Sequence, residues 1–177
     1  ERDGARARVE GDGMSTHRDY RVGNGFDVHR LVEGRPCVLG GITLPHATGP
    51  LGHSDGDAVL HAITDAILGA AGLDDLGTLF PDRDPKFKGA DSAKLLAHAL
   101  AKVVEKGFVV VNVDVVITTE GPRIAPHRPA MRARIAELLA VDPERVNVKG
   151  KTVEGLGALA HGAGVAVHAV CLLARGA

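Results

Sequence analysis

The chain has 177 residues, of which 45% are hydrophobic and 3% aromatic, and its formal net charge is −1. This length suits one domain whose core is built from aliphatic side chains. The balanced charge gives no indication of a nucleic-acid partner, and no apolar run reaches the roughly 18 residues of a membrane span. With only two cysteines, neither a disulfide framework nor a cysteine-based zinc site is expected, which favours a reducing compartment.

The first 20 residues differ from the rest of the chain. They are polar and show no hydrophobic periodicity, which is typical of a disordered tail. Met14 is a candidate start, with residues 1–13 left from an upstream linker or an expression vector. We expect the folded domain to occupy residues 21–177.

Strands and helices alternate along this domain. The patterns predict strands at 21–29, 37–42, 108–119, 145–150 and 164–174, and helices at 57–71, 92–106 and 129–140. The first two strands are expected to pair through the loop between them. An acidic stretch at 73–91 is longer than most connections, which usually indicates function or disorder.

This order predicts an α/β (α+β) two-layer fold, in which helices cover one face of a small mixed sheet. The last strand, "GVAVHAVCLLA", is apolar on both faces, and such strands are normally covered on both sides. We therefore expect a second subunit to cover the face that has no helices. His98 and His168 are expected to be structural.

The stretch "RVGNGFDVHRL" places a carboxylate and an imidazole two residues apart. In a strand, Asp27 and His29 point to the same side, where they could bind a divalent ion. The alternative is an ordinary polar pair on a half-exposed strand.

A second polar set lies in "GHSDGDAVLHAITD", where His53, Asp57, His61 and Asp65 recur every four residues. His53 and Ser54 precede a helix, and the start of a helix favours an anion. His61 lies near the border of the buried stripe and needs a partner. Together with Asp27 and His29 it would supply three zinc ligands and leave one position open, which is the arrangement of a catalytic site.

Two later stretches have weaker patterns. "KGKT" lacks the first glycine of a phosphate-binding loop, because Arg145 occupies that position. Lys151, Thr152 and Glu154 remain candidates for phosphate and Mg²⁺ binding, although a plain surface turn is the preferred interpretation. The proline-rich segment after strand 108–119 is either a stiff rim of a ligand site or a simple connection.

Taken together, several segments resemble the 2-C-methyl-D-erythritol 2,4-cyclodiphosphate synthases of the non-mevalonate isoprenoid pathway. They are "GNGFDVHRL", "LGHSDGDAVLHAITDAILGA", "DDLGTLFPDRDPKFKGADS", "NVDVVI", "PRIAPH" and "VNVKGKTVEGLG". The resemblance covers residues 21–174. It implies a homotrimer whose sheets pack around the three-fold axis, with active sites between subunits. It also implies a cytoplasmic location, or the plastid stroma in a plastid-bearing organism.

The resemblance further implies the site. Zn²⁺ would be bound by Asp27, His29 and His61, and Mg²⁺ or Mn²⁺ by Glu154, while His53 and Thr152 would stabilise the transition state. The implied substrate contacts are Asp27, Val28, His29, His53, Ser54, Asp75, Leu76, Gly77, Phe80, Pro81, Asp82, Arg83 and Asp84. Those implied around the cytidine diphosphate part are Thr119, Glu120, Gly121, Pro122, Arg123, Ile124, Ala125, Lys151, Thr152, Val153 and Glu154, from a neighbouring subunit. Ala158 and His161 are implied near the trimer axis.

One part of the resemblance is incomplete. Where the family often carries an aromatic residue, an Arg and a Glu around an axial pocket for isoprenoid diphosphates, this chain has Ala158, His161 and Ala163. A neutral histidine cannot replace a bidentate arginine on a phosphate. We expect weak or no binding of such diphosphates there.

The implied activity is an intramolecular cyclisation with release of CMP, in which the 2-phosphate of 4-diphosphocytidyl-2-C-methyl-D-erythritol 2-phosphate attacks the β-phosphate. This chemistry needs no protein nucleophile, because nucleophile and electrophile belong to one molecule. The main alternative is a zinc-dependent phosphohydrolase of a nucleotide-type substrate. A non-enzymatic alternative is a trimeric nucleotide-binding regulator.

Overall fold

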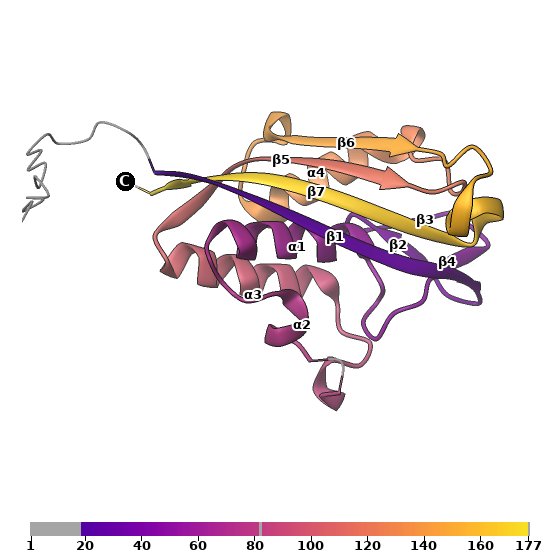
Figure 1. Cartoon of the computed structure of the whole chain (residues 1–177), viewed down its shortest axis with the longest axis horizontal. Coiled ribbons are helices and arrows are strands. Elements are labelled where there is room, and N and C mark those ends of the chain that lie inside the picture. The colour runs from indigo at the N-terminus through magenta and orange to yellow at the C-terminus, as the bar shows by residue number, and fades with distance from the viewer. Residues whose placement is uncertain (1–18, 82, 177) are drawn as a thin grey trace, which may run out of the picture.

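The computed structural model describes residues 19–81 and 83–176, which form a two-layer α/β domain (Figure 1). A five-stranded mixed sheet has the order β4-β1-β7-β5-β6, in which only β5 and β6 run parallel. Its strands are β1 Tyr20–Glu33, β4 Thr48–Pro50, β5 Phe108–Thr118, β6 Val146–Lys151 and β7 Gly164–Arg175. The expected small mixed sheet is therefore confirmed.

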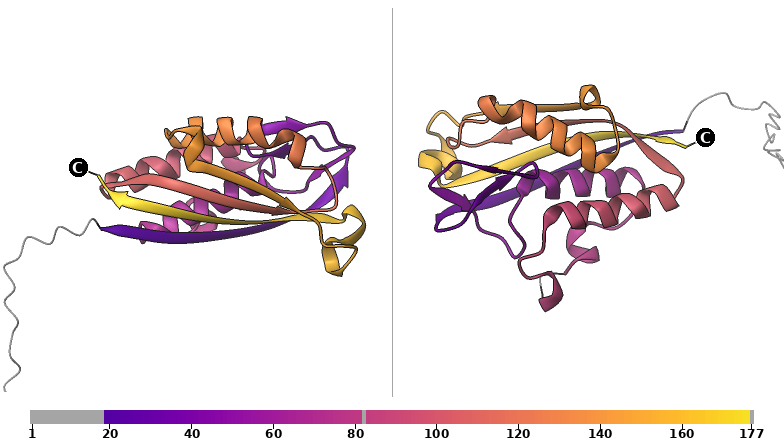
Figure 2. Two further views of the ribbon diagram at one scale, coloured as in Figure 1. Left: turned by 90° about the horizontal axis from the view of Figure 1, so that it is seen from above. Right: turned by 180° about the vertical axis from the view of Figure 1, so that it is seen from behind.

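Three main helices lie on one face of this sheet: α1 Ala58–Ala70, α3 Ser92–Glu105 and α4 Arg128–Leu139 (Figure 2). The short helix α2 Leu76–Leu79 and the 3₁₀ turns η1 Pro85–Phe87, η2 Ala125–His127, η3 Pro143–Arg145 and η4 Gly157–Gly162 lie in the connections. The long acidic segment thus contains α2 and η1. Among the described residues, every helix is too short or too polar to cross a bilayer.

The prediction of one strand at 37–42, paired with the first strand, is wrong. Cys37–Leu39 (β2) pairs instead with Ile42–Leu44 (β3) as a separate two-stranded hairpin. Gly40 and Gly41 form its turn, with φ of +67° and +74°, and such consecutive positive values are those of the preferred hairpin turns. The first strand continues to Glu33 and pairs with β4, a short strand that the sequence pattern did not indicate.

The face of the sheet without helices is uncovered in the single chain. Val22 is 71% exposed, and Phe26, Val28 and Val170 are about half exposed. His168, which was expected in a buried strand, is also exposed and stacks against Phe26 with ring centroids 4.7 Å apart. The expected covering of β7 on both faces is therefore not provided by residues 19–81 and 83–176 of one chain.

The two ends of the described chain meet where the neighbouring strands β1 and β7 begin and end. β1 begins at Tyr20, one residue before the expected start of the domain. Asp19 forms ion pairs with Arg21 at 2.8 Å and with Arg175 at 3.0 Å. A disordered tail was predicted for residues 1–20, which is wrong for Asp19 and Tyr20 because both belong to the folded domain. Residues 1–18 lie outside the described residues.

Helix α1 packs against β1 because two glycines remove the side chains between them. A Cβ atom on Gly23 would lie 2.0 Å from the Ala66 carbonyl oxygen, and one on Gly25 would lie 1.9 Å from that of Ala62. The next residues on this side of β1 are Asp27 and His29. The sequence "GNGFDVH" therefore places a helix directly beside these two polar side chains.

Candidate metal centre and adjoining cavities

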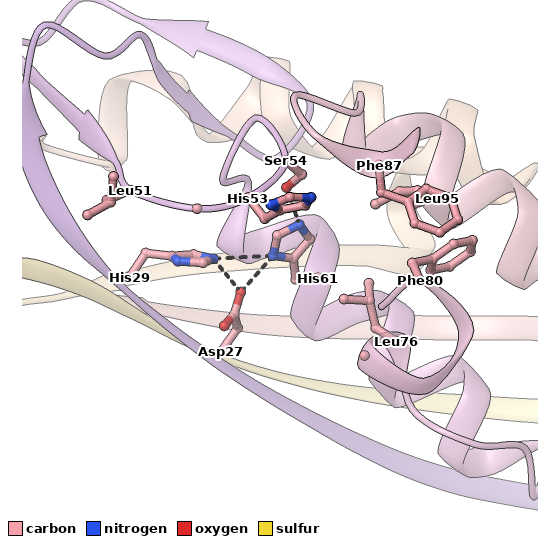
Figure 3. A pocket seen from close by; sticks show the side chains of 12 residues that line it. Asp27, His29, Leu51, His53, Ser54, His61, Leu76, Phe80, Phe87 and Leu95 are labelled. Carbon is pink, nitrogen blue, oxygen red and sulfur yellow. Dashed lines mark hydrogen bonds and ion pairs between the residues drawn. The ribbon is translucent and has the colours of Figure 1, made fainter. Parts of the chain in front are cut away.

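Three polar side chains meet between β1 and the first turn of α1. Asp27 and His29 point from β1 toward His61 on α1 (Figure 3). Asp27 Oδ2 lies 3.0 Å from His29 Nε2 and 2.9 Å from His61 Nδ1, and the two nitrogens are 3.3 Å apart. The residues that were expected to share one ion are thus brought together, as the period-two spacing of β1 requires.

These distances fit a small tetrahedral ion. With metal–ligand bonds of about 2.0–2.2 Å, tetrahedral zinc separates its ligand atoms by about 3.3–3.6 Å. The three ligand atoms need to move apart by only a few tenths of an ångström. One carboxylate and two imidazoles form a suitable ligand set for a divalent transition metal.

The electrostatics of the trio favour a cation. Burial raises the pKa of the Asp27 carboxyl, but hydrogen bonds with His29 and His61 outweigh burial and hold this pKa well below its usual range. For His29, burial lowers the pKa, whereas the hydrogen bond and charge of Asp27 raise it above its ordinary value. A carboxylate that stays ionised beside two imidazoles attracts either protons or a metal ion.

Helix α1 is held in position by Asp57. Its carboxylate accepts hydrogen bonds from the Val59 and Leu60 N–H groups at the helix start. It also accepts bonds from Gly40 and Gly41 in the β2–β3 turn, at 2.9 and 2.6 Å. Asp57 therefore fixes the start of α1, and with it His61, relative to the hairpin.

A cavity of about 330 Å³ opens beside the trio (Figure 3). Among the expected substrate contacts, Asp27, His29, His53, Ser54, Leu76, Gly77 and Phe80 line it. The Nε2 atom of His53 is buried and has no hydrogen-bond partner within the described part of the chain. A buried polar atom without a partner indicates that a ligand or water normally contacts it.

Other residues expected in this region have local roles or lie away from the cavity. Asp75 caps α2 by accepting a bond from Thr78 N–H at 2.8 Å. Asp84 pairs with Lys86 at 2.9 Å, while Pro81 and Arg83 are exposed. Asp82 lies outside the described residues.

A second cavity, of about 210 Å³, lies at the ends of the parallel strands β5 and β6. It is lined by Thr119, Glu120, Pro122, Arg123, Ile124, Ala125, Arg128, Gly150, Lys151 and Thr152. The proline-rich segment and the "GKT" segment, whose lining residues are at least 22 positions apart in sequence, thus form one hollow. It shares no lining residue with the first cavity.

The segment after this second cavity is held by Glu120. Its two carboxylate oxygens accept hydrogen bonds from Gly155 N–H at 2.6 Å and from His161 N–H at 2.5 Å. Glu154 has a positive φ of 52°, and its carboxylate accepts a hydrogen bond from the Thr152 hydroxyl. Neither Val153 nor Glu154 lines the second cavity, and Ala158 and His161 are exposed in η4.

Sequence reasoning missed several residues of the first cavity. Leu51, Gly52, Phe87 and Leu95 line it, and the buried Ser92 contacts His61 Nε2 at 2.9 Å. In the sequence Ser92 had only the pattern of a helix cap, a role that Asp91 fills by accepting a bond from Ala93 N–H. No spacing rule connects Ser92 with His61, 31 residues away.

Fold and site together define a two-layer α/β protein with a candidate divalent-metal centre in a cleft. The sequence pattern of the YgbB family matches residues 20–174, and this chain belongs to that family.

Curated 2-C-methyl-D-erythritol 2,4-cyclodiphosphate synthases are similar to this chain. That of Bordetella avium (strain 197N) is 56% identical over 156 residues, covering 88% of this chain and 96% of the relative. That of Laribacter hongkongensis (strain HLHK9) is 58% identical, with coverages of 88% and 96%.

Two solved structures are similar to this chain in fold. A 2C-methyl-D-erythritol-2,4-cyclodiphosphate synthase in its CDP-bound form has a TM-score of 0.80 at 42% identity, covering 86% of this chain and 99% of that chain. The bifunctional IspDF of Campylobacter jejuni has a TM-score of 0.86 at 43% identity over 90% of this chain. This chain covers 43% of that longer protein.

Proposed function

We propose that this chain is a cyclodiphosphate synthase, a phosphorus–oxygen lyase. It converts 4-diphosphocytidyl-2-C-methyl-D-erythritol 2-phosphate into 2-C-methyl-D-erythritol 2,4-cyclodiphosphate and CMP. The observation that carries the proposal is the convergence of Asp27, His29 and His61 on one point beside a cavity, in a chain that is 56% identical to a curated synthase over most of its length.

The reaction needs no protein nucleophile, because the bond that forms and the bond that breaks both belong to the substrate. An oxygen of the 2-phosphate forms a bond to the β-phosphorus, and the bond from that phosphorus to the bridging oxygen of CMP breaks. The bridging oxygen leaves with its electron pair as part of the CMP phosphate. The task of the protein is to hold the substrate bent, because intramolecular attack gains most from orientation.

We assign Asp27, His29 and His61 to Zn²⁺, and Glu154 to Mg²⁺ or Mn²⁺. Bound divalent ions would offset the charge of clustered phosphate oxygens, which otherwise repels the attack. One carboxylate plus phosphate oxygens is a usual environment for Mg²⁺. Glu154 can provide this carboxylate. The Thr152 hydroxyl donates to its Oε1, which leaves Oε2 for the metal ion.

The two cavities suggest how the substrate is divided. His53, with its unpartnered Nε2, and Ser54 would hold the diphosphate, and Leu76, Gly77 and Phe80 the methylerythritol part in the first cavity. The second cavity, with Arg123 and Lys151 on its rim, would bind the cytidine end. In a homotrimer, the second cavity of one subunit would face the trio of its neighbour.

The homotrimer is supported by the apolar face of the sheet that no helix covers. A cytidine nucleotide as ligand is supported by the CDP-bound form of the similar synthase. A location in the cytoplasm or the plastid stroma remains a prediction.

Product analysis tests the proposal. Purified protein with zinc and Mg²⁺ should release one CMP and one cyclic diphosphate for each substrate consumed. Free inorganic phosphate in place of the cyclic product would instead indicate a phosphohydrolase. The substitution His61→Ala should abolish turnover, whereas a nucleotide-binding regulator would keep its function in that variant.

A further inference from the structure

A buried hydroxyl and a half-buried carboxylate lead away from the metal centre on the far side of His61. His61 Nε2 lies 2.9 Å from Ser92 Oγ, and Ser92 Oγ lies 2.5 Å from Asp55 Oδ1. The three residues come from α1, the start of α3 and the loop before α1. Ser92 is 1% exposed, so water does not reach the contact between its hydroxyl and His61.

The direction of these hydrogen bonds follows from Asp55. Its Oδ2 accepts a bond from Ser92 N–H at 3.0 Å, and its Oδ1 accepts one from Asp57 N–H at 3.1 Å. A carboxylate surrounded by such donors acts as an acceptor. The Ser92 hydroxyl, which has one proton, therefore donates that proton to Asp55.

Ser92 Oγ then presents only lone pairs to His61. For a hydrogen bond at 2.9 Å, the proton must be on Nε2 of the imidazole. Ser54 Oγ, 3.1 Å from the same nitrogen, already accepts a bond from Gly56 N–H. It is a second acceptor beside this proton, and its own proton can turn to Ser92 Oγ at 3.5 Å or into the cavity.

A neutral imidazole with its proton on Nε2 keeps a lone pair on Nδ1. Nδ1 is the atom that faces Asp27 Oδ2 and His29 Nε2. In the metal-free protein a proton on Nδ1 makes the hydrogen bond to Asp27, and a bound metal ion would replace that proton. We propose that Asp55 and Ser92 are positioning residues that hold the proton on His61 Nε2 and so keep Nδ1 available for the metal. This proposal rests on the metal centre of the proposed function. Metal-binding histidines commonly donate their second N–H to such a partner, and loss of the partner typically lowers metal affinity 10- to 100-fold.

The substitution Asp55→Asn tests this directly. Its amide oxygen can still accept a backbone N–H, but its NH₂ group donates to Ser92 Oγ. The Ser92 proton then turns toward His61 Nε2, which favours the tautomer with its proton on Nδ1. That proton occupies the nitrogen that would bind the metal. We expect zinc affinity, measured on the full chain by competition with a chelator and without substrate, to fall about 10- to 100-fold.

Three further variants separate this effect from a general loss of stability. Ser92→Ala breaks the same link, so the double variant Asp55→Asn/Ser92→Ala should bind zinc no more weakly than Ser92→Ala alone. Asp91→Asn, at the adjacent helix cap, should stay within about twofold of the unchanged protein, because asparagine also caps helices well. Additive losses in the double variant, or an unchanged affinity in Asp55→Asn, would overturn the proposal.

Histidine-selective ¹⁵N NMR of the zinc-loaded protein gives a second readout, first in the unchanged protein and then in Ser92→Ala. The His61 signal should show a proton on Nε2 and zinc on Nδ1, and exchange of that proton should be at least tenfold faster in Ser92→Ala. Zinc on Nε2 would contradict the proposal. If the unchanged protein binds no divalent ion, both this proposal and the assigned metal centre fail, whereas missing CMP release with an intact Nε2 proton contradicts only the proposed function.

Discussion

At the scale of single residues, the site depends on a carboxylate that is placed beside two imidazoles. The pKa of Asp27 is lowered and that of His29 is raised, because each stabilises the charged form of the other. In the metal-free protein, a proton on His29 therefore stabilises the Asp27 carboxylate, as a bound metal ion would. Metal and proton compete for the same nitrogen.

This competition predicts opposite effects of pH with and without metal. Because the pKa of His29 is raised on folding, its contribution to stability is complete below its unfolded value near 6.5 and is lost as pH rises through the folded value. The melting temperature of metal-free protein should thus fall between pH 6 and 9, relative to the variant His29→Gln. With saturating zinc, the melting temperature of the unchanged protein minus that of His29→Gln should instead rise with pH, because metal binding requires a neutral histidine. Thermal melts measure this difference with and without zinc. The same change with pH in both cases would contradict the account.

At the scale of elements, the approach of α1 to β1 brings the two halves of the trio together. The sequence predicted both elements and the shared side of Asp27 and His29, because strand and helix periods are local properties. It did not predict the contact between Ser92 and His61 or the β2–β3 hairpin. These depend on how distant segments pack and on a glycine turn that interrupts an apolar run.

Two glycine-to-alanine substitutions test the approach of α1 to β1. Gly25→Ala should destabilise the protein by about 3 kcal/mol, because the new Cβ would overlap the Ala62 carbonyl oxygen. Gly69→Ala, at an exposed position of the same helix with nothing within 4 Å of the new Cβ, should stabilise it by about 0.5–1 kcal/mol. Chemical denaturation measures both, and a neutral Gly25→Ala would mean that α1 does not pack as described.

The loop after β6 provides another test at this scale. Glu120→Gln keeps one acceptor oxygen but turns an NH₂ group toward a backbone N–H, so either Gly155 or His161 loses its partner. Bonds to a charged acceptor contribute about 1.5–3 kcal/mol. Hydrogen exchange at one or both of these amides should accelerate about tenfold or more.

The matched control is Glu137→Gln on the surface of α4, where, among the described side chains, Glu137 pairs with Arg134 alone. It should leave exchange in the 153–162 segment unchanged. Equal exchange in Glu120→Gln and in the unchanged protein would show that Glu120 does not hold this segment.

At the scale of the whole molecule, the uncovered sheet face is the largest feature that the single chain leaves unexplained. The two-layer class could be predicted, since the order of strands and helices restricts the possible architectures. What covers the apolar strands could not be derived from their composition, which indicates burial without naming the partner. The proposed homotrimer came from the resemblance.

A charge on this face tests the homotrimer. Val22→Lys, at a side chain that is 71% exposed in the single chain, should shift the mass in solution from three chains of 18.4 kDa toward one. An unpaired charge is costly in an apolar interface. Val104→Lys, at a half-exposed position on α3, should leave the mass unchanged. Light scattering distinguishes these outcomes, and a monomeric unchanged protein would contradict the homotrimer.

The central claim is that Asp27, His29 and His61 bind a divalent ion that this chain needs in order to cyclise its substrate. The most direct measurement combines zinc content per chain with product analysis on 4-diphosphocytidyl-2-C-methyl-D-erythritol 2-phosphate. The account predicts about one zinc per chain, one CMP and one cyclic diphosphate per substrate, and loss of both zinc and products in His61→Ala. Unchanged CMP release from zinc-free His61→Ala, or release of inorganic phosphate in place of the cyclic product, would contradict it.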